Sequence, residues 1–285
     1  MNERTTDVLV IGSGIAGLAA ALAAAREGAE VTLATKAAQP EGASSWWAQG
    51  GIAVARDDPE QFKRDIVEAS AGTADPEAVE VLVENANDAV REVLIETLDV
   101  EFDTNGVEER GEGEDSPEPF DFGREAAHEE PRILHVDAST GKHIHVPFLN
   151  HLDDHPQVEI LEDTAALELL RHEGRVHGAM LEQDDEVAPT YAGATILATG
   201  GTGDLYPVST NPKGSTGDGI AMAALAGADT ADMEYVQFHP TVCVADEDDP
   251  FLVSEAVRGE GGLLRNGDGE RFMPDIHEDA ELAPR

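Results

Sequence analysis

The feature that most constrains the fold of this chain is a glycine-rich turn near its N-terminus. The apolar run Asp7-Val-Leu-Val-Ile-Gly12 predicts a buried parallel strand, and the alanine-rich stretch from Gly14 to Glu27 predicts a helix that ends at Gly28. Ala29 to Thr35 then predicts a second strand. The turn itself, Gly12-Ser-Gly14-Ile-Ala-Gly17, matches G-x-G-x-x-G within the strand–helix–strand unit that this motif requires.

Each glycine of this turn has a physical role in binding a pyrophosphate. Gly12 permits the tight turn, Gly14 lets the backbone approach the ligand, and Gly17 allows the helix to pack closely on the strand. The helix N-terminus adds unpaired N–H groups and the positive end of its dipole. We therefore expect a bound dinucleotide; the alternative is a tight glycine turn that binds nothing.

The residues after the second strand bear on which dinucleotide binds. An NAD site usually has an acid there to hold the adenosine ribose, whereas this chain has Thr35-Lys36, which weakens the prediction of NAD. A second glycine pair, Gly200-Gly201, follows the apolar run from Ile196. It is either a further contact to the ligand or another turn at the end of a strand.

Charge and composition narrow the class of protein to which this chain can belong. Eighteen Lys and Arg against 59 Asp and Glu give a net charge of −41, which argues against nucleic-acid partners and anionic membranes. No apolar run reaches the roughly 18 to 20 residues of a membrane span. The acidic residues are spread between the apolar segments, as on the surface of a protein from a halophile; the alternative is an acidic protein from a mesophile.

Cysteine count and the N-terminal sequence bear on localisation. One cysteine excludes an internal disulfide framework, and the start of the chain lacks a leader pattern, so we expect a cytoplasmic protein.

Further elements follow from periodicity and from turn residues. Helices are predicted at 59–71, 76–98 and 140–152, and a polar loop at 104–121. Strands are predicted at 158–161, 164–171, 176–182 and 191–198, with a hairpin turn at His172-Glu-Gly-Arg175.

Four separated motifs then carry a resemblance that runs along the chain. They are Trp47-Ala-Gln-Gly-Gly-Ile52, Gln237-Phe-His-Pro-Thr241, Glu255-Ala-Val-Arg-Gly-Glu-Gly261 and Leu282-Ala-Pro-Arg285. In this order they resemble the fumarate reductase/succinate dehydrogenase flavoprotein family. The resemblance implies an α/β fold: an FAD-binding doubly wound (Rossmann-like) domain over residues 1–232, and the start of an α+β capping domain over residues 233–285.

The resemblance also implies which residues hold FAD. The set is Gly12, Ser13, Gly14, Ile15, Ala16, Gly17, Lys36, Ser44, Ser45, Trp46, Trp47, Ala48, Gln49, Gly50, Gly51, Ala165, Ala166, Thr199, Gly200, Gly201 and Asp218. Membrane-bound members attach FAD to a histidine where this chain has Ser44, so we expect a non-covalent flavin. Asp218 could instead serve only the start of a helix.

A second position separates the relatives by substrate. Arg124-Glu125-Ala-Ala-His128, followed by Arg132-Ile-Leu-His135, resembles the stretch of family members that oxidise L-aspartate, in which the glutamate orients the substrate ammonium. A carboxylate has a reason to stand there for an amino acid and none for succinate. The alternative for Glu125 is one more acid on a very acidic surface.

The implied reaction is the oxidation of L-aspartate to iminoaspartate, with O₂ or fumarate as electron acceptor. His239 and Ser254 would bind a substrate carboxylate, Arg285 would transfer a proton, and Glu255 with Arg258 would form its relay. His239 could instead be a turn histidine and Arg258 a structural ion-pair partner. The resemblance places the reaction first in NAD biosynthesis, with quinolinate synthase as a partner.

Two other functions stay open at this point. A soluble fumarate reductase or succinate dehydrogenase flavoprotein would share every motif except Glu125. A non-catalytic FAD-binding fragment is the other, because the family chain continues well past Ala-Pro-Arg285. We therefore expect a truncated chain or one completed by a second polypeptide.

Overall fold

The computed structural model describes residues 2–105, 119–125, 128–245, 250–254 and 256–283. The chain divides into two compact units, each described by itself. Unit 1 contains residues 1–47 and 144–236, and unit 2 contains residues 48–143 and 237–285. The expected domain boundary between residues 232 and 233 stays a prediction.

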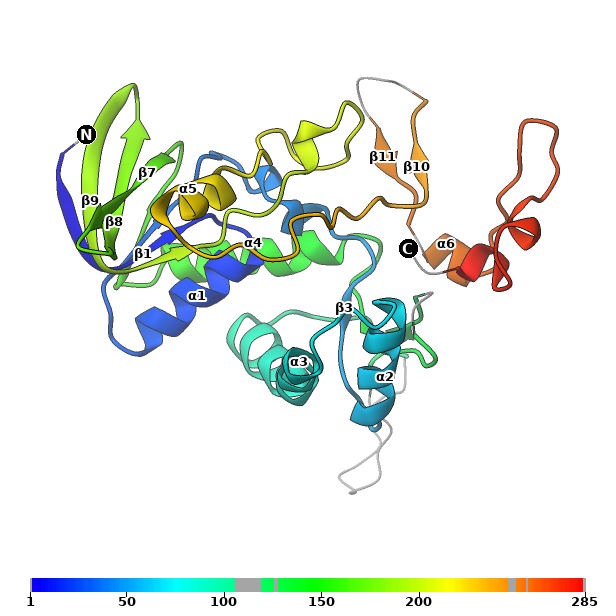
Figure 1. The fold of residues 1–285 in the computed structure, drawn as a ribbon. Helices are drawn as coiled ribbons and strands as arrows, with labels where there is room; N and C mark the ends of the chain where they lie inside the picture. The colour runs from blue at the N-terminus through cyan, green and yellow to red at the C-terminus, as the bar shows by residue number, and fades with distance from the viewer. Residues whose placement is uncertain (1, 106–118, 126–127, 246–249, 255, 284–285) are drawn as a thin grey trace, which may run out of the picture. The chain divides into compact units, whose positions relative to one another are not determined.

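Unit 1 is built on a six-stranded sheet of order β6-β2-β1-β9-β8-β7. Figure 1 labels β1, β9, β8 and β7 of this sheet. Its first four strands are parallel neighbours: β6 (Val158–Leu161), β2 (Val31–Ala34), β1 (Arg4–Ile11) and β9 (Glu186–Leu197). β9 then continues as an antiparallel meander through β8 (Arg175–Gln183) and β7 (Ala165–His172). Since β1 pairs with β2 on one side and β9 on the other, the strand order reverses there, as in doubly wound folds.

Helices pack on both faces of this sheet. α1 (Ile15–Arg26) contacts β1, β2 and β9, and α5 (Asp218–Ala226) contacts β7. Leu9 and Ile11 of β1 share a buried cluster with Met222 of α5. Because strand side chains alternate, Val8 and Val10 face the opposite side, where α1 lies. The predicted doubly wound α/β fold is confirmed.

Two-residue turns join the strands of the meander. The predicted hairpin at His172-Glu-Gly-Arg175 is present, and Glu173 and Gly174 both have positive φ, at 48° and 77°. The next turn is Asp184-Asp185, again with positive φ at both residues. The prediction of a strand beginning at residue 191 was therefore wrong. We expected an acidic loop at 184–186, but Glu186 already pairs with Gln183.

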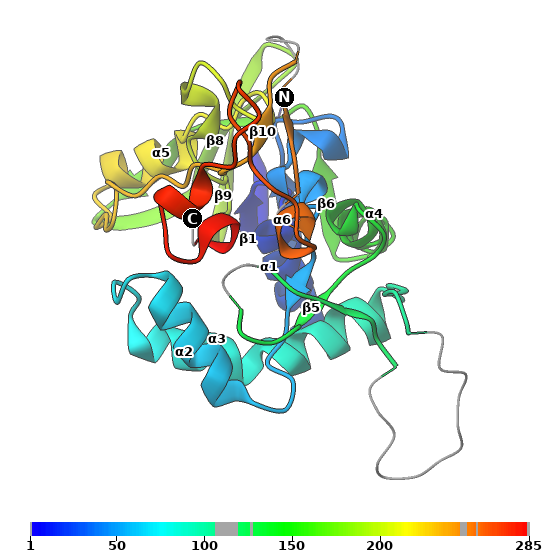
Figure 2. The same cartoon turned by 90° about the vertical axis from the view of Figure 1, so that its right-hand side faces the viewer.

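Unit 2 contains a helix pair and two small sheets. α2 (Pro59–Ala69) packs on α3 (Pro76–Ala89), as Figure 2 shows, and Phe62 and Val83 lie in their shared core. Each helix begins with a proline after an aspartate whose carboxylate accepts a backbone N–H, from Gln61 at 2.8 Å and from Glu77 at 2.9 Å. The predicted helix at 76–98 ends as a π-helix from residue 90 to 97.

The remaining elements are short, apart from one helix. Residues 106–118 of the predicted loop at 104–121 lie outside the described residues. Among the helices that the structure describes, none has the length and apolar character to cross a membrane.

The remaining strands are β3 (Ile52–Ala53), β4 (Phe122–Gly123), β5 (Ile133–Leu134), β10 (Val242–Cys243) and β11 (Phe251–Leu252). The remaining α-helices are α4 (Thr140–Asp153) and α6 (Ala256–Gly259). Short 3₁₀ helices lie at Pro40–Gly42, Ser44–Trp47, Gly203–Leu205, Met273–Asp275 and Ala280–Leu282.

Candidate functional site

The glycine turn has the geometry that its sequence predicts. Gly12 has φ +111°, and a Cβ there would lie 2.2 Å from the carbonyl oxygen of Ala198. A Cβ on Gly17 would lie 1.9 Å from the carbonyl oxygen of Gly12. Real Cβ atoms do not approach so closely, so both positions exclude any side chain.

Gly14 differs from these two because space lies beside it. A Cβ on Gly14 would meet only the hydroxyl of Ser45, at 3.4 Å, and Gly14 is the N-cap residue of α1. The amide of Ile15 donates to that same hydroxyl at 3.0 Å. With a bare backbone and a helix dipole at this point, the turn fits a pyrophosphate group.

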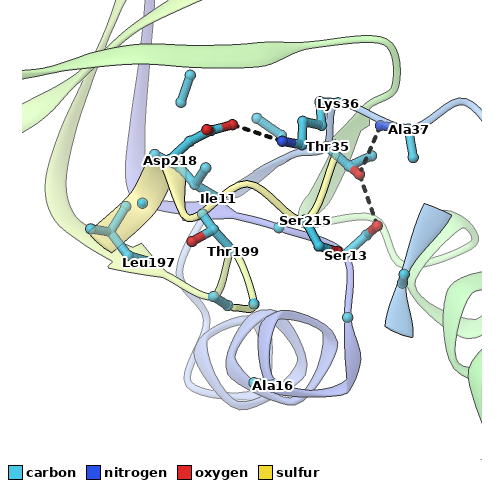
Figure 3. A pocket seen from close by; sticks show the side chains of 18 of the residues that line it. Ile11, Ser13, Ala16, Thr35, Lys36, Ala37, Leu197, Thr199, Ser215 and Asp218 are labelled. Atoms are coloured by element: carbon cyan, nitrogen blue, oxygen red, sulfur yellow. Dashed lines mark hydrogen bonds and ion pairs between the residues drawn. The ribbon is translucent and has the colours of Figure 1, made fainter. Parts of the chain in front are cut away.

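A cavity of about 440 Å³ opens at this turn, within unit 1 (Figure 3). It lies at the carboxyl ends of β1, β2 and β9, where open α/β sheets bind their ligands. Its volume is in the range of small-molecule and cofactor pockets, about 300 to 1,000 Å³.

Most of the predicted FAD residues line this cavity. They are Gly12, Ser13, Gly14, Ile15, Ala16, Lys36, Ser44, Ser45, Ala165, Ala166, Thr199, Gly200 and Asp218. Gly17, Trp46, Trp47, Ala48, Gln49, Gly50, Gly51 and Gly201 are not among its lining residues. Lining residues that sequence reasoning missed include Thr35, Thr164, Ser215 and Gly219.

An ion pair joins two predicted cofactor residues in the cavity wall. The Lys36 ammonium lies 2.7 Å from the Asp218 carboxylate, which also accepts the Thr216 hydroxyl at 2.7 Å (Figure 3). These contacts lower the pKa of Asp218, with Lys36 the larger cause, so the group is ionised. The N-cap of α5 is Gly217, with φ +79°, and Asp218 stands in the first turn.

The side chains of Thr35 and His145 hold the turn in place at Ser13. The Ser13 hydroxyl lies 2.9 Å from the Thr35 hydroxyl. Nε2 of His145, on α4, lies 2.6 Å from the Ser13 carbonyl oxygen, and His145 is fully buried. Burial lowers the pKa of His145, against a smaller opposing effect of its bond to Ser13. Sequence reasoning missed His145, because nothing local marks a polar residue on the buried face of a helix.

In unit 2, two predicted motifs come together. A Cβ on Gly50 would lie 1.9 Å from Oε1 of Glu125, so the Glu125 carboxylate lies against the Gly50 backbone. Gly51, with φ +138°, leaves room for the carbonyl oxygen of Leu134, which lies 2.2 Å from where its Cβ would be. The Gln49 amide donates to the Leu252 carbonyl at 3.5 Å, which connects the same segment to β11.

The β10–β11 hairpin brings two other predicted residues together. Val242 pairs with Leu252, and the Val253 amide donates to the Thr241 carbonyl at 3.1 Å. Continuing this register places His239 and Ser254 on neighbouring chain segments just beyond the strands. His239 Nδ1 lies 3.0 Å from the Thr241 carbonyl oxygen, in a turn.

Of the predicted proton relay, only Arg258 is described. It is buried on α6 and donates from Nη1 to the Glu281 carbonyl at 2.8 Å. The Glu281 carboxylate accepts two hydrogen bonds from Arg271 that are 3.0 Å or shorter, and Arg271 lowers the pKa of Glu281 to about 2. Glu255 and Arg285 lie outside the described residues.

A buried ionic cluster supports the segment that carries Glu125. Asp65 of α2 lies 3.5 Å from Arg132 Nη2 and 3.8 Å from His128 Nδ1, and accepts the Glu129 amide at 3.3 Å. The His128 amide in turn donates to the Glu125 carbonyl at 3.1 Å. Burial and then Arg132 lower the pKa of His128. An acid within the apolar pattern of the predicted helix at 59–71 was the available signal for Asp65.

The chain is similar to known proteins over nearly its whole length. The FAD binding domain family matches residues 7–285. An L-aspartate oxidase of Halobacterium salinarum is 64% identical over 99% of this chain and 54% of its own length. An L-aspartate oxidase of Synechocystis is 40% identical over 100% of this chain and 50% of its own length.

A solved structure shares the fold. Escherichia coli quinol fumarate reductase FrdA superposes with a TM-score of 0.86 at 26% identity, over 100% of this chain and 49% of that one. This chain therefore spans about half the length of the relatives that it matches.

Proposed function

We propose that this chain, which belongs to the FAD binding domain family, is the flavin-binding part of an L-aspartate oxidase. The reaction removes two electrons and two protons from L-aspartate, from Cα–H and N–H, and gives iminoaspartate. Bound FAD would accept the electron pair, and O₂ or fumarate would then take it, giving hydrogen peroxide or succinate. FAD as the cofactor follows from membership of the family.

The observation that carries the proposal is the position of Glu125. Its carboxylate lies against Gly50, inside the Trp47-Ala-Gln-Gly-Gly-Ile52 motif that we assign to the flavin side of the site. An ammonium group bound there would gain a charged hydrogen-bond acceptor, whereas the methylene hydrogens of succinate would gain nothing. Glu125 would thus orient the amine and select an amino acid.

The cofactor would be held mainly by backbone and by small side chains. Ser13 to Gly17 would cradle the pyrophosphate, Ala165 and Ala166 would lie by the adenine, and Lys36 and Asp218 would contact polar groups of FAD. The Ser44 hydroxyl donates to the Asn211 side-chain oxygen at 3.2 Å. A serine at this position lacks the imidazole nitrogen that forms the covalent bond to the flavin in the membrane-bound members. The flavin would therefore be non-covalent and released by acid.

The substrate carboxylates would be bound from the β10–β11 hairpin. His239 and Ser254 offer an imidazole and a hydroxyl there, and the hairpin is tied to the Gln49 segment by the Gln49–Leu252 hydrogen bond. A Cβ on Gly259 would lie 3.0 Å from the Arg124 carbonyl oxygen, which places α6 beside the segment of Glu125.

Arg258, Glu255 and Arg285 would complete the site as a proton relay. Because the pKa of arginine is above about 12, Arg285 could give up a proton only transiently, with Glu255 and Arg258 restoring it, or would act mainly as an electrostatic clamp. This assignment rests on the sequence motifs.

A second candidate is a fumarate reductase or succinate dehydrogenase flavoprotein. The superposition on E. coli quinol fumarate reductase FrdA favours it, since the fold is the same. Glu125 argues against it on chemical grounds, because succinate has no ammonium. A non-catalytic FAD-binding part is the remaining alternative.

We place the enzyme in the cytoplasm, at the first step of NAD biosynthesis, with quinolinate synthase as the partner that consumes iminoaspartate. The L-aspartate oxidases among its relatives support the proposed reaction and its step in NAD biosynthesis.

Steady-state turnover tests the proposal and identifies the oxidant. With L-aspartate and O₂ we expect hydrogen peroxide, and without O₂ we expect fumarate to be reduced to succinate as aspartate is consumed. Oxidation of succinate by an artificial dye, with no response to aspartate, would favour the second candidate. Bound FAD with neither activity would favour the non-catalytic alternative.

A further inference from the structure

His145 is a fully buried histidine that the proposed reaction does not use. It lies on α4, and its Nε2 is 2.6 Å from the Ser13 carbonyl oxygen, between Gly12 and Gly14. A carbonyl oxygen can only accept, so Nε2 carries the hydrogen and donates it. In the neutral ring Nδ1 is then the unprotonated nitrogen, and among the residues that the structure describes Nδ1 has no hydrogen-bond partner.

This contact sets the direction of one peptide group in the pyrophosphate turn. The Ser13 C=O and the Gly14 N–H belong to the same planar trans peptide and point in opposite directions. Since His145 holds the C=O toward α4, the Gly14 N–H points away from α4. Gly14 lines the cavity, and its neighbour Ile15 begins α1.

The rest of Ser13 is held as well, by its side chain. Its hydroxyl lies 2.9 Å from the buried Thr35 hydroxyl at the end of β2. The peptide that follows Ser13 is therefore fixed by contacts to both α4 and β2. A peptide held in advance binds an anion without the cost of ordering it at that moment.

His145 would act as a neutral donor and not as a counter-charge. Burial lowers its pKa, and protonation would place a second N–H at Nδ1, where the described residues offer no acceptor. Glu41 is the nearby charge that opposes this effect. A neutral ring leaves the attraction of a diphosphate to the amides and the helix dipole.

We propose that His145 is a positioning residue of the pyrophosphate site: its Nε2–H holds the Ser13 carbonyl and thereby directs the Gly14 amide toward the bound diphosphate. The inference deepens the cofactor site of the proposed function and depends on FAD binding, not on aspartate as substrate. It predicts an effect confined to ligands that carry a diphosphate.

The test compares ADP with adenosine, by calorimetric titration of the apoprotein. His145→Leu removes the donor and should weaken ADP about tenfold, the worth of one hydrogen bond, while adenosine changes by less than about twofold. His145→Gln keeps an N–H donor near the position of Nε2 and should restore most of the ADP affinity. His151→Leu, on the same helix but half-buried, is the matched control.

The possible outcomes separate the inference from the proposed function. Equal loss of ADP and adenosine affinity in His145→Leu, or no loss at all, overturns the inference alone. Wild-type protein that binds neither ADP nor FAD overturns the proposed function and the inference with it.

A second measurement keeps the inference testable if His145→Leu does not fold. Nitrogen-15 NMR of the wild-type histidines reports the tautomer directly. A neutral Nε2–H ring that persists when ADP is added supports the proposal. An Nδ1–H ring or an imidazolium at neutral pH contradicts it.

Discussion

The Glu125 carboxylate lies so close to Gly50 that a β-carbon on Gly50 would stand 1.9 Å from its Oε1. This contact brings together two segments that are 75 positions apart in the sequence, the one with the double glycine and the one with the candidate specificity residue. Selection of L-aspartate over succinate would depend on this one charge.

Glu125→Gln should therefore lower kcat/KM for L-aspartate by about ten- to a hundredfold, the value of a hydrogen bond to a charged group. The flavin absorbance should be unchanged, because the glutamine has the same shape. Glu129→Gln is the matched control, since Glu129 is an exposed acid of the same segment. Equal activity in both variants would make Glu125 a surface acid only.

Gly17→Ala should destabilise the apoprotein by about 1 to 3 kcal/mol, the usual cost of overpacking, and should abolish FAD binding. The reason is the 1.9 Å approach of an added Cβ to the Gly12 carbonyl oxygen. Gly201→Ala is the control, because no atom lies within 4 Å of its Cβ position. Thermal unfolding of the two apoproteins measures the difference; similar midpoints would argue against the close helix–strand contact.

The ionised Glu281 carboxylate should stabilise the folded state over a definite range of pH. Its folded-state pKa is lowered to about 2 from 4.5, chiefly by Arg271, so the stabilisation is present above 4.5 and is lost as the pH falls toward 2. Unfolding of wild type and Glu281→Gln should therefore differ most at neutral pH and converge in acid. Glu278→Gln, at an exposed acid nearby, should track wild type throughout. A difference that stays constant with pH would contradict the ion pair.

The net charge of −41 predicts stabilisation by salt. Self-repulsion among the carboxylates is screened as the Debye length falls from about 10 Å at 0.1 M to about 3 Å at 1 M. We expect the thermal midpoint to rise by at least about 4 °C over this range of KCl, or roughly 2 kcal/mol for a chain of this length. Sorbitol at matched osmolality is the non-ionic control, and an equal rise in sorbitol would exclude screening as the cause.

Local signals predicted the parts of the fold that local physics determines. Gly12 and Gly17 are required by backbone contacts, and Glu173-Gly174 has the positive φ values of a two-residue turn. The start of β9 was misplaced because Asp184 and Asp185 are read as a loop, although both residues adopt the left-handed conformation of a tight turn. The FAD cofactor was predicted from the motifs and is confirmed by the family match.

Buried polar residues were the ones that sequence reasoning missed. His145 and Asp65 owe their importance to partners far away in the chain, Ser13 and Arg132. No periodicity or spacing states such pairings, because they arise only when helices pack. The roles proposed for Glu255 and Arg285 stay predictions, since both residues lie outside the described part of the chain.

Anaerobic reduction of the bound flavin in high salt tests the central claim most directly. We expect L-aspartate to bleach the yellow absorbance of the flavin and succinate to leave it unchanged. Bleaching by succinate but not by L-aspartate would contradict the account.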